Sequence, residues 1–370
     1  MSLRITEIEI RLCRPPVAAI EAAELRGGTG SALEFLVVSL TTDDGLRADT
    51  FGFAGRSARM AGEIAATVLK PFFLGRDPLY REKHWHDFRM VDRWWNHVPI
   101  YSYGPFDIAC WLIGALAARQ PLYQYLGAYR DRVPIYASSL VLATPEEYAQ
   151  QALAVQAQGW AAYKLHPPGD VVFDLDAYRA CREAVGNRFT LMADPVAAYT
   201  HGQAMRVGRE LERLGYHWLE EPLFDVDFHG LRELTRALDI PICGVEVLPG
   251  SHYSAAECIA SRVVDIVRTD VSWKGGITPV MKTAHLAESF GVQCEIHTAI
   301  YHLLELVNLH CCAAIKNCEF FELLYPVEPY RFGLAQPIEI EDGAAVLPRG
   351  PGLGIDLDWD FIENATFDIL

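Results

Sequence analysis

Seven successive apolar segments of this sequence each end in a residue that can bind a metal ion or move a proton. In chain order these residues are Lys164, His166, Asp194, Glu220, Glu246, Asp270, His297 and Glu322. From Lys164 onward, each segment ends 24 to 30 residues after the previous one. A single acid, histidine or lysine after a strand is common, whereas seven in a row are hard to obtain by chance. The regular spacing therefore points to one shared site.

Three of these residues are carboxylates from neighbouring segments, namely Asp194, Glu220 and Glu246. Three carboxylates that meet in one volume repel each other strongly unless a cation lies between them. Oxygen ligands without clustered thiols favour Mg²⁺ over zinc or copper. The residue types therefore predict a magnesium site.

Candidate proton-transfer groups flank the three carboxylates. Lys164 and His166 are two residues apart, so both side chains leave a strand on the same face. On the other side comes His297, and Asp270 from the preceding segment can hydrogen-bond it, which fixes the imidazole tautomer and raises its basicity. A metal between two such groups is suited to removing a proton from a carbon next to a carboxylate.

The segments that carry these residues alternate with amphipathic helical stretches. The eight β-rich runs are Val133–Ser138, Ala162–Leu165, Phe189–Met192, His217–Leu219, Pro241–Val245, Asp265–Arg268, Cys294–Ile296 and Phe320–Leu323. Alternation at this repeat length predicts parallel βαβ units, and eight units over about 190 residues predict a closed barrel with one mouth at the strand ends. An open doubly wound sheet is the alternative, but no Gly-x-Gly-x-x-Gly motif follows the first strand.

The segment before the barrel has a different pattern. Strands are expected at Arg4–Arg11 and Leu33–Thr41, and helices at Ala58–Leu69 and Phe106–Leu126. The tail from Pro326 onward is rich in Pro, Gly and Asp, and we expect it to pack against this N-terminal unit.

The expected architecture is therefore an α/β protein in three parts. An α+β capping domain at residues 1–130 precedes a (β/α)₇β TIM-type barrel at residues 131–325, and a C-terminal tail at residues 326–370 returns to the cap. A length of 370 residues suits one large barrel with a smaller companion. Hydrophobic residues make up 51% and charged residues 22%, which is typical of a globular protein.

Net charge and cysteine usage indicate which classes of partner are disfavoured and which cellular compartment we expect. The formal net charge of −16 disfavours nucleic acid and anionic membrane surfaces as partners. Nine scattered cysteines without a C-x-x-C pair indicate neither a disulfide framework nor a zinc knuckle. The N-terminus alternates polar and apolar residues, unlike a signal peptide, and no uninterrupted apolar run is long enough to span a bilayer. We expect a cytoplasmic protein.

The ordered motifs resemble those of the mandelate racemase-like branch of the enolase superfamily. In the barrel they are Val133-Pro-Ile-Tyr-Ala-Ser, Lys164-x-His166, Asp194, Trp218-Leu-Glu-Glu-Pro222, Glu246, Asp270 before Gly275-Gly276, and His297, followed by Pro351-Gly-Leu-Gly-Ile-Asp356 in the tail. Phe106-Asp-Ile-Ala-Cys-Trp111 and Pro121-Leu-Tyr-Gln-Tyr-Leu-Gly127 are similar to the capping domain of that family. The resemblance covers nearly the whole chain.

This resemblance implies a role for each candidate residue. Asp194, Glu220 and Glu246 would ligate Mg²⁺, and Lys164 would polarise the carboxylate of a small substrate. The Asp270–His297 dyad would be a general base or acid. Glu322, for which Glu319 is a rival, would hydrogen-bond the substrate carboxylate. The dyad is similar to that of the branch in which dehydration of sugar acids predominates, and relatives are usually symmetric homo-oligomers.

Two positions depart from the family pattern. The family more often has Lys-x-Lys where this chain has Lys164-x-His166. An imidazole has an ordinary pKa of about 6.5 against about 10.4 for a lysine amine, so a histidine here can act as a neutral base near pH 7, or it can only bind substrate. In addition, an Asn often stands two residues after the first metal ligand, and Val196 replaces it here.

Other functions and simpler structural explanations remain alternatives. Racemisation or epimerisation of a 2-hydroxy or related acid needs the same two-sided arrangement of bases. Muconate-cycloisomerase and dipeptide-epimerase branches use Lys where this chain has Asp270, and a zinc amidohydrolase would carry His-x-His in Val133–Ser139. A non-catalytic, crystallin-like or ligand-sensing relative would have lost a metal ligand. Taken singly, Asp194 could cap a helix and His297 could be a core histidine.

Two segments of the cap, Pro15–Ser31 and Phe51–Arg59, are expected to close over the mouth, and the first contains the Gly-rich stretch Arg26-Gly-Gly-Thr-Gly30 that suits a mobile lid. The cluster Trp94-Trp95-Asn96-His97 is a candidate to line the pocket from the cap. Core or interface packing is an equal alternative for the two tryptophans.

Overall fold

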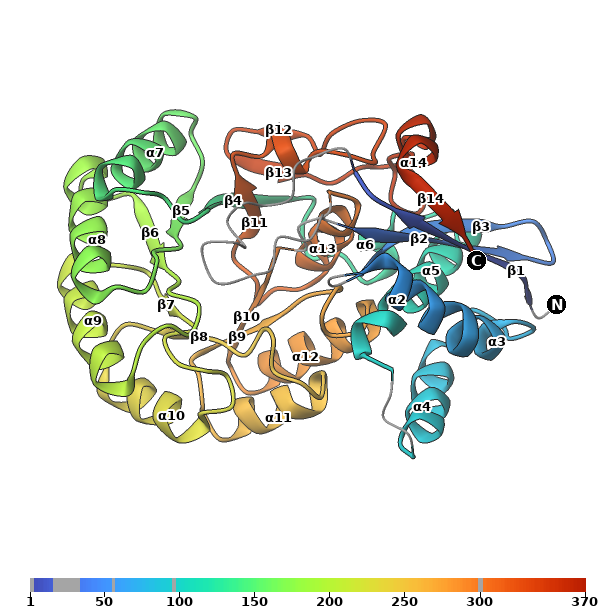
Figure 1. The fold of residues 1–370 in the computed structure, drawn as a ribbon, viewed down its shortest axis with the longest axis horizontal. Helices are drawn as coiled ribbons and strands as arrows, with labels where there is room; N and C mark the ends of the chain where they lie inside the picture. Colours follow the sequence, from blue (N-terminus) through green and yellow to red (C-terminus); the bar gives the residue numbers. More distant parts are fainter. Residues whose placement is uncertain (1–2, 16–33, 55–56, 95–97, 299–301) are drawn as a thin grey trace.

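The computed structural model describes residues 3–15, 34–54, 57–94, 98–298 and 302–370. Most of the expected lid segment Pro15–Ser31, the pair 55–56 and residues 95–97 lie outside the described residues. Two sheets organise the described part, a four-stranded antiparallel sheet and a ten-stranded sheet that closes on itself (Figure 1).

Eight parallel strands form a closed barrel, because the last of them, β11, pairs with the first, β4. The strands are β4 (Arg132–Ser139), β5 (Ala162–Leu165), β6 (Thr190–Ala193), β7 (Leu219–Glu220), β8 (Ile242–Gly244), β9 (Ile266–Thr269), β10 (Gln293–Ile296) and β11 (Phe321–Tyr325). The helices between them are α7 (Pro145–Ala157), α8 (Val171–Val185), α9 (His201–Leu214), α10 (Phe228–Ala237), α11 (His252–Ala260), α12 (Ile277–Ser289) and α13 (His302–Ala314). The predicted (β/α)₇β barrel is confirmed.

Local sequence explains where several barrel helices begin. The side chains of Thr144, Asp170 and Thr200 accept hydrogen bonds from the first-turn N–H groups of α7, α8 and α9. At α9 the side chain of Gln203 also reaches back to the Thr200 backbone, which completes a capping box. α9 ends at Gly215, whose left-handed φ of 66° a glycine adopts without steric cost. These residues therefore fix where α7, α8 and α9 begin and where α9 ends, before the chain returns to the next strand.

The interior of the barrel has an apolar layer with a charged layer above it. The apolar layer is one cluster of buried residues, made of Tyr136, Ala162, Met192, Trp218, Cys243, Ile266 and Phe320. Alternate residues of a strand face the same side, so the position two residues later also points into the barrel, nearer its mouth. Those positions include Lys164, Asp194, Glu220, Arg268 and Glu322. Strand alternation alone therefore gathers charged groups above an apolar floor.

The cap is built from both ends of the chain. Its sheet has the order β14-β1-β2-β3, with β1 (Ile5–Cys13), β2 (Phe35–Thr42), β3 (Arg47–Phe53) and β14 (Thr366–Ile369). Its helical part comprises α2 (Ala58–Ile64), the π-helical turn η1 (Ala65–Leu69), α3 (Lys70–Phe73), α4 (Arg81–Asp92), α5 (Ile100–Ala117) and α6 (Leu122–Tyr125). Both termini lie on the cap side of Figure 1. The expected return of the tail to the cap is confirmed.

The remaining elements of the tail cross from the barrel to the cap. They are the 3₁₀ turn η2 (Glu328–Tyr330), the hairpin β12 (Ile340–Glu341) and β13 (Ala344–Val346), and α14 (Trp359–Ala365). β13 pairs antiparallel with β4, so the tail extends the barrel sheet before it reaches the cap.

The helix expected over Phe106–Leu126 differs from the structure. α5 begins six residues earlier, at Ile100, and ends at Ala117, and α6 is a separate short helix. The break follows from Arg119, whose backbone is left-handed at φ 53°, and from Pro121, which cannot continue a helix. α5 is long and apolar enough to cross a membrane, but 72% of it is buried within the protein as a core helix.

Buried Asp107 joins α5 of the cap to the barrel. Its carboxylate accepts hydrogen bonds from Thr278 N and Thr278 Oγ1 at the start of α12, at 2.8 and 2.6 Å. Gly276 has a φ of 104°, and a Cβ atom there would lie 2.5 Å from the Asp107 carboxylate, so only glycine permits this approach. The turn between β9 and α12 is therefore fixed against the cap.

Candidate active site

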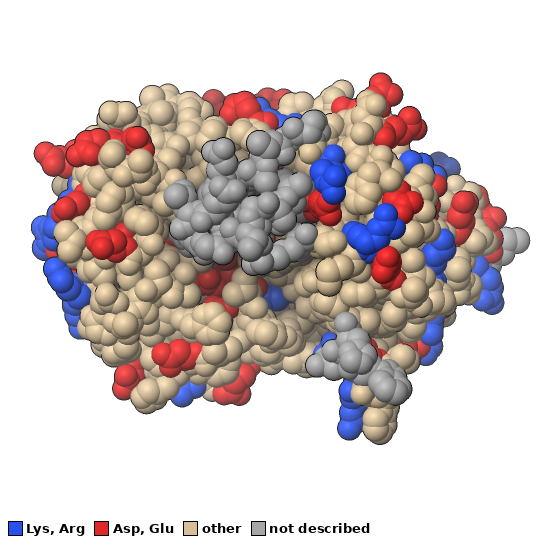
Figure 2. All heavy atoms as spheres, viewed as in Figure 1, with Lys and Arg blue, Asp and Glu red and all other residues tan. Residues whose placement is uncertain are grey.

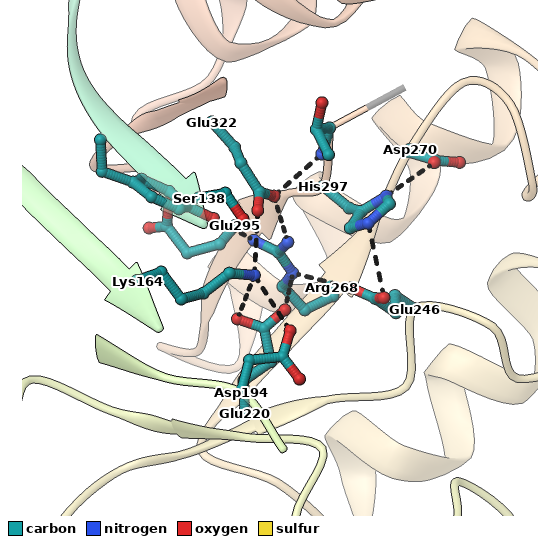
Figure 3. A network of polar contacts seen from close by, with 12 residues as sticks. Ser138, Lys164, Asp194, Glu220, Glu246, Arg268, Asp270, Glu295, His297 and Glu322 are labelled. Atoms are coloured by element: carbon teal, nitrogen blue, oxygen red, sulfur yellow. Dashed lines mark hydrogen bonds and ion pairs between the residues drawn. The ribbon is translucent and has the colours of Figure 1, made fainter. Parts of the chain in front are cut away.

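The eight residues singled out in the sequence gather at the carboxyl ends of the barrel strands and form one network of polar contacts. Figure 3 shows seven of them, and His166 joins the network through its contact with Asp194. Figure 2 shows that the face drawn there is hollowed near its centre, and that Lys and Arg are interspersed with Asp and Glu and form no single basic patch on it. Most side chains of the network are buried, so the electrostatic interactions among them are stronger than between exposed groups.

Lys164 is fully buried at the end of β5 among three carboxylates. Its Nζ lies 2.9 Å from Glu220 Oε2 and 3.2 Å from Asp194 Oδ2. A third contact, of 2.9 Å, joins it to Glu322 Oε1. Burial alone would lower the pKa of Lys164, but Glu220 and Glu322 hold it well above the usual value, so the amine is charged.

A second buried cation, Arg268, was not predicted from the sequence. Its Nε lies 3.0 Å from Glu220 Oε1 and 3.2 Å from Glu246 Oε2. On the other side of the guanidinium, one amino group lies 2.6 Å from Glu322 Oε2 and the other donates to Tyr136 Oη at 3.1 Å. Arg268 therefore links two proposed metal ligands with Glu322. The signal that could have found it is its place two residues before Asp270, which puts both side chains on the inner face of β9.

The carboxylates outnumber these two cations. Asp194, Glu220, Glu246 and Glu322 are four carboxylates around Lys164 and Arg268, which leaves two negative charges without a permanent cation when the histidines are neutral. Burial raises the pKa of Glu220 to about 7 in spite of Arg268 and Lys164, so the cations of the protein do not fully compensate its charge. Glu220 Oε1 is also buried without an aligned hydrogen bond. A divalent cation held by oxygen ligands fits this charge and donor set.

The carboxylates do not form a preorganised metal-binding site in this arrangement. Among the described residues, no three Asp, Glu, His or Cys side chains are arranged as a cluster that could hold an ion as they stand. Asp194, Glu220 and Glu246 instead point toward Lys164, Arg268 and the two histidines, so metal binding would require these side chains to change their contacts. The carboxylate of Asp194 is held by the charges of His166 and Lys164, which keep its pKa well below the usual range against the effect of burial.

His297 and Asp270 form the expected pair at the ends of β10 and β9. The ring atom His297 Nδ1 lies 3.1 Å from Asp270 Oδ2, so an N–H there donates to the carboxylate and leaves Nε2 as the basic atom. Nε2 faces Glu246 Oε1 at 3.5 Å. Burial alone would lower the pKa of His297, but Glu246 and Asp270 raise it above its usual value.

The surroundings of this pair fix its orientation. The indole of Trp273 stacks on the His297 ring, with 4.6 Å between centroids, while Trp273 N donates to Asp270 Oδ1 at 2.6 Å. Asn308 donates to the carbonyl of His297 at 2.8 Å and accepts from Val271 N. The stacking on Trp273 and the contact with Asp270 therefore hold the imidazole with Nε2 toward Glu246.

His166 lies on the other side of the carboxylates. β5 and β10, which carry the two histidines, are three strands apart one way round the barrel and five the other. His166 Nδ1 lies 2.7 Å from the carbonyl of Ser139, and Nε2 lies 2.8 Å from Asp194 Oδ2. Both partners only accept hydrogen bonds, so each contact is a hydrogen bond only when the ring nitrogen that faces it carries the proton. Nε2 of His166 therefore points toward the carboxylates from the side opposite His297.

Glu322, not its rival Glu319, lies in the network. Glu322 is buried on β11 and accepts a hydrogen bond from Thr298 N at 2.9 Å in addition to its contacts with the two cations. Lys164 and Arg268 hold the pKa of Glu322 well below its usual range although burial would raise it, so the group is ionised. Glu319 is half-exposed and faces His217 at 3.4 Å. What Glu322 does toward a substrate stays a prediction.

Comparisons with known proteins agree with this arrangement. A family model described as Enolase C-terminal domain-like matches residues 147–361. The magnesium complex of D-glucarate dehydratase from Agrobacterium tumefaciens is 32% identical, with a TM-score of 0.87 over 98% of this chain and 99% of that one. L-talarate/galactarate dehydratase of Salmonella typhimurium is 29% identical over 96% of this chain and 89% of its own. N-succinyl-L-Arg/Lys racemase of Bacillus cereus is 26% identical over 98% of both chains. The chain therefore belongs to the enolase C-terminal domain-like family, within the mandelate racemase/enolase superfamily.

Proposed function

We propose that this protein is a Mg²⁺-dependent dehydratase of sugar acids, which removes the proton alpha to the substrate carboxylate and eliminates the β-hydroxyl as water. The observation that carries the proposal is a pair of histidines on either side of a buried group of carboxylates whose charge a divalent cation would balance. Dehydratases of sugar acids among the relatives support the substrate class.

Asp194, Glu220 and Glu246 are the residues that would hold Mg²⁺. Bound there, the ion would act as a Lewis acid that offsets negative charge developing on the substrate carboxylate. Lys164, the charged amine nearest these carboxylates, is proposed to bind one oxygen of the substrate carboxylate. Arg268 and Glu322 keep Lys164 and the carboxylates in position through ion pairs, and Glu322 is proposed to act on the substrate through Lys164.

The two histidines divide the proton transfers in this proposal. His297, with Nδ1–H held by Asp270, takes the proton from C2 at Nε2. The bond between C3 and its hydroxyl oxygen then breaks, and His166 gives its Nε2 proton to the leaving hydroxyl, which departs as water. The resulting enol becomes a 2-keto-3-deoxy acid by moving one proton from oxygen to C3. One substrate therefore yields one keto acid and one water, with no oxidant or reductant.

The direct test is proton NMR in D₂O with Mg²⁺ and a pool of aldonic and aldaric acids. We expect a 2-keto-3-deoxy product with the intact chain and none with His297→Asn. His229→Asn is the matched control, because His229 is 84% exposed on the surface and should leave turnover unchanged. No change in any acid of a broad pool, despite confirmed Mg²⁺ binding, would exclude sugar acids as substrates.

A second variant separates the two histidines. If His297 removes the alpha proton and His166 protonates the leaving group, His166→Asn should retain deuterium exchange at C2 and lose elimination. A general acid or base contributes about 10²- to 10⁴-fold to a rate, so elimination should fall by that order. Loss of exchange in His166→Asn with exchange retained in His297→Asn would reverse the assignment.

Racemisation or epimerisation of a 2-hydroxy or related acid is the second candidate. The same two-sided placement of His166 and His297 favours it, and a racemase is among the relatives. Alpha-proton exchange or formation of an epimer without loss of water, in the same NMR experiment, would select this reaction.

We further propose a cytoplasmic homo-oligomer. All nine cysteines lie in the described part of the chain, and each thiol is free and buried, which suits a reducing compartment. Light scattering after size-exclusion chromatography would give the mass in solution, and a strictly monomeric mass at micromolar concentration would contradict an oligomer.

A further inference from the structure

Lys274, which the proposed reaction does not use, is a fully buried lysine next to one proposed metal ligand. It lies in the turn between β9 and α12, and its residue is 2% exposed. Nζ donates hydrogen bonds of 2.8 Å to the backbone carbonyls of Val245 and Leu248. These two carbonyls belong to the residues one before and two after Glu246. The ammonium therefore closes a ring around the backbone that carries Glu246.

Glu246 needs such support because its side chain points inward at a position where regular strand alternation would point it outward. Cys243 points into the barrel, so alternation would place residue 245 inward and residue 246 outward. Val245 instead has a left-handed φ of 70° and packs in the outer core, and Glu246 takes the inward position next to Arg268. A β-branched residue in this region is a conformational outlier with a steric cost. The surrounding structure must hold it.

The other two proposed ligands are held by strand pairing. Asp194 N donates to Leu165 O of the neighbouring strand at 2.9 Å, and Glu220 is itself part of β7 and pairs with Cys243. The pairing of β8 with β9 has its last partners at Gly244 and Val267, two residues before Glu246. Strand pairing thus fixes the backbone of Asp194 and Glu220, whereas the two hydrogen bonds from Lys274 fix the backbone around Glu246.

Two further hydrogen bonds connect the β8–α11 loop, which carries Glu246, to adjacent loops. Ser251 Oγ donates to the carbonyl of Lys274 at 2.7 Å, so the β8–α11 loop and the β9–α12 turn bond each other in both directions. Asp225, from the β7–α10 loop, accepts a hydrogen bond from Val247 N. Asp225, Glu221 and Asp270 also act on the Lys274 ammonium through their charge. Two of the three N–H donors of Lys274 are therefore bonded to carbonyls of the Glu246 loop, and nearby carboxylates balance its charge.

We propose that Lys274 is a positioning residue for Mg²⁺, which acts by holding the strained loop that presents Glu246. The inference rests on the proposed metal site, in which Glu246 is a ligand. Residues that orient a ligand without touching the metal typically change its affinity by about 10- to 100-fold when they are mutated. Lys274 therefore sets how well the site binds its cation and not which proton is moved.

The test compares Lys274→Met with Lys282→Met in the full chain. Methionine keeps most of the volume of lysine and removes the donors, while Lys282 is a partly exposed lysine of the following helix, α12, and pairs with Glu82. Calorimetric titration with MgCl₂ should show affinity about 10- to 100-fold weaker in Lys274→Met and unchanged in Lys282→Met. Hydrogen exchange of the amides of residues 245–251, measured without metal, should be faster in Lys274→Met only.

The outcomes separate this inference from the proposed function. Wild-type Mg²⁺ affinity and wild-type exchange of residues 245–251 in a folded Lys274→Met protein would overturn the role of Lys274 and leave the metal site standing. Absence of Mg²⁺ binding by the wild-type chain would overturn both. If Lys274→Met does not fold, Ser251→Ala removes the hydrogen bond to the Lys274 carbonyl without changing charge, and it should also accelerate exchange in the loop and weaken Mg²⁺ binding; no change in either would overturn the role.

Discussion

Arg268 is the residue whose removal should disturb the site most through charge alone. It is buried completely and faces Glu220, Glu246 and Glu322, which are themselves buried. Breaking a buried ion pair by removing one partner is far more damaging than losing an exposed pair, because the remaining charge is left without compensation. A guanidinium in this place also sets the distance between neighbouring carboxylates.

We therefore predict that Arg268→Met lowers the free energy of unfolding by about 3–5 kcal/mol. Urea unfolding followed by circular dichroism would measure the loss, and MgCl₂ should restore part of it, because the ion supplies positive charge to the same carboxylates. Arg213→Met is the matched control: this arginine pairs with Glu210 on the surface and should unfold at nearly the wild-type urea concentration. Equal losses in the two variants would contradict the prediction.

Arg268 also shows where sequence reasoning reached its limit. The spacing of strand-end residues was enough to bring Lys164, Asp194 and His297 to one mouth, since a barrel dictates that geometry. Arg268 ends an apolar run, where an arginine is usually a surface residue whose charged end reaches water. Its burial depends on carboxylates from three other strands, and no local pattern encodes such a contact.

At the scale of elements, α13 is joined to the cap and the tail through one histidine. His310 Nδ1 accepts from Tyr123 N at the start of α6, at 3.1 Å, and Nε2 donates to the carbonyl of Leu353 in the tail, also at 3.1 Å. The neutral ring satisfies both contacts, and an imidazolium would lose the first. Burial lowers the pKa of His310 to about 4.

This junction makes stability depend on pH. The unfolded chain binds a proton at His310 with an ordinary pKa near 6.5, and the folded chain binds it only near 4, so stability is fully present above pH 6.5 and is lost as the pH falls to 4. The contribution is about 3 kcal/mol. Urea midpoints at pH 7.5, 6, 5 and 4.5 should fall more steeply for the wild type than for His310→Gln. Parallel curves would contradict this assignment.

The same region shows why element boundaries were less predictable than the barrel. The apolar periodicity from Phe106 onward correctly indicated a helix. α5 nevertheless starts earlier, at Ile100, and most residues between Ile100 and Phe106 are buried within the protein. Pro105 lies within α5 where a sequence argument would place a helix start. Tertiary packing decided these ends, whereas the short β strands of the barrel are marked by their own apolar runs.

At the scale of the whole molecule, metal binding should be visible as stability. A ligand that binds only the folded state at 100 times its dissociation constant stabilises it by about 2.7 kcal/mol, which for a chain of this length is about 3 °C in Tm. We predict such a rise with MgCl₂ over NaCl of equal ionic strength, measured by scanning calorimetry, and its loss in Glu246→Gln. A rise of the same size in both proteins would place the ion elsewhere.

The pairing of β14 with β1 has a consequence for biosynthesis. Ile10 and Leu370 exchange backbone hydrogen bonds, so one strand of the cap sheet is supplied by residues 366–370. A ribosome makes β1 first and these residues more than 350 positions later. Until then the edge of β1 is open and can pair with other chains. A chain that stops between residues 326 and 365 would therefore have every barrel strand and an unfinished cap sheet with the edge of β1 exposed.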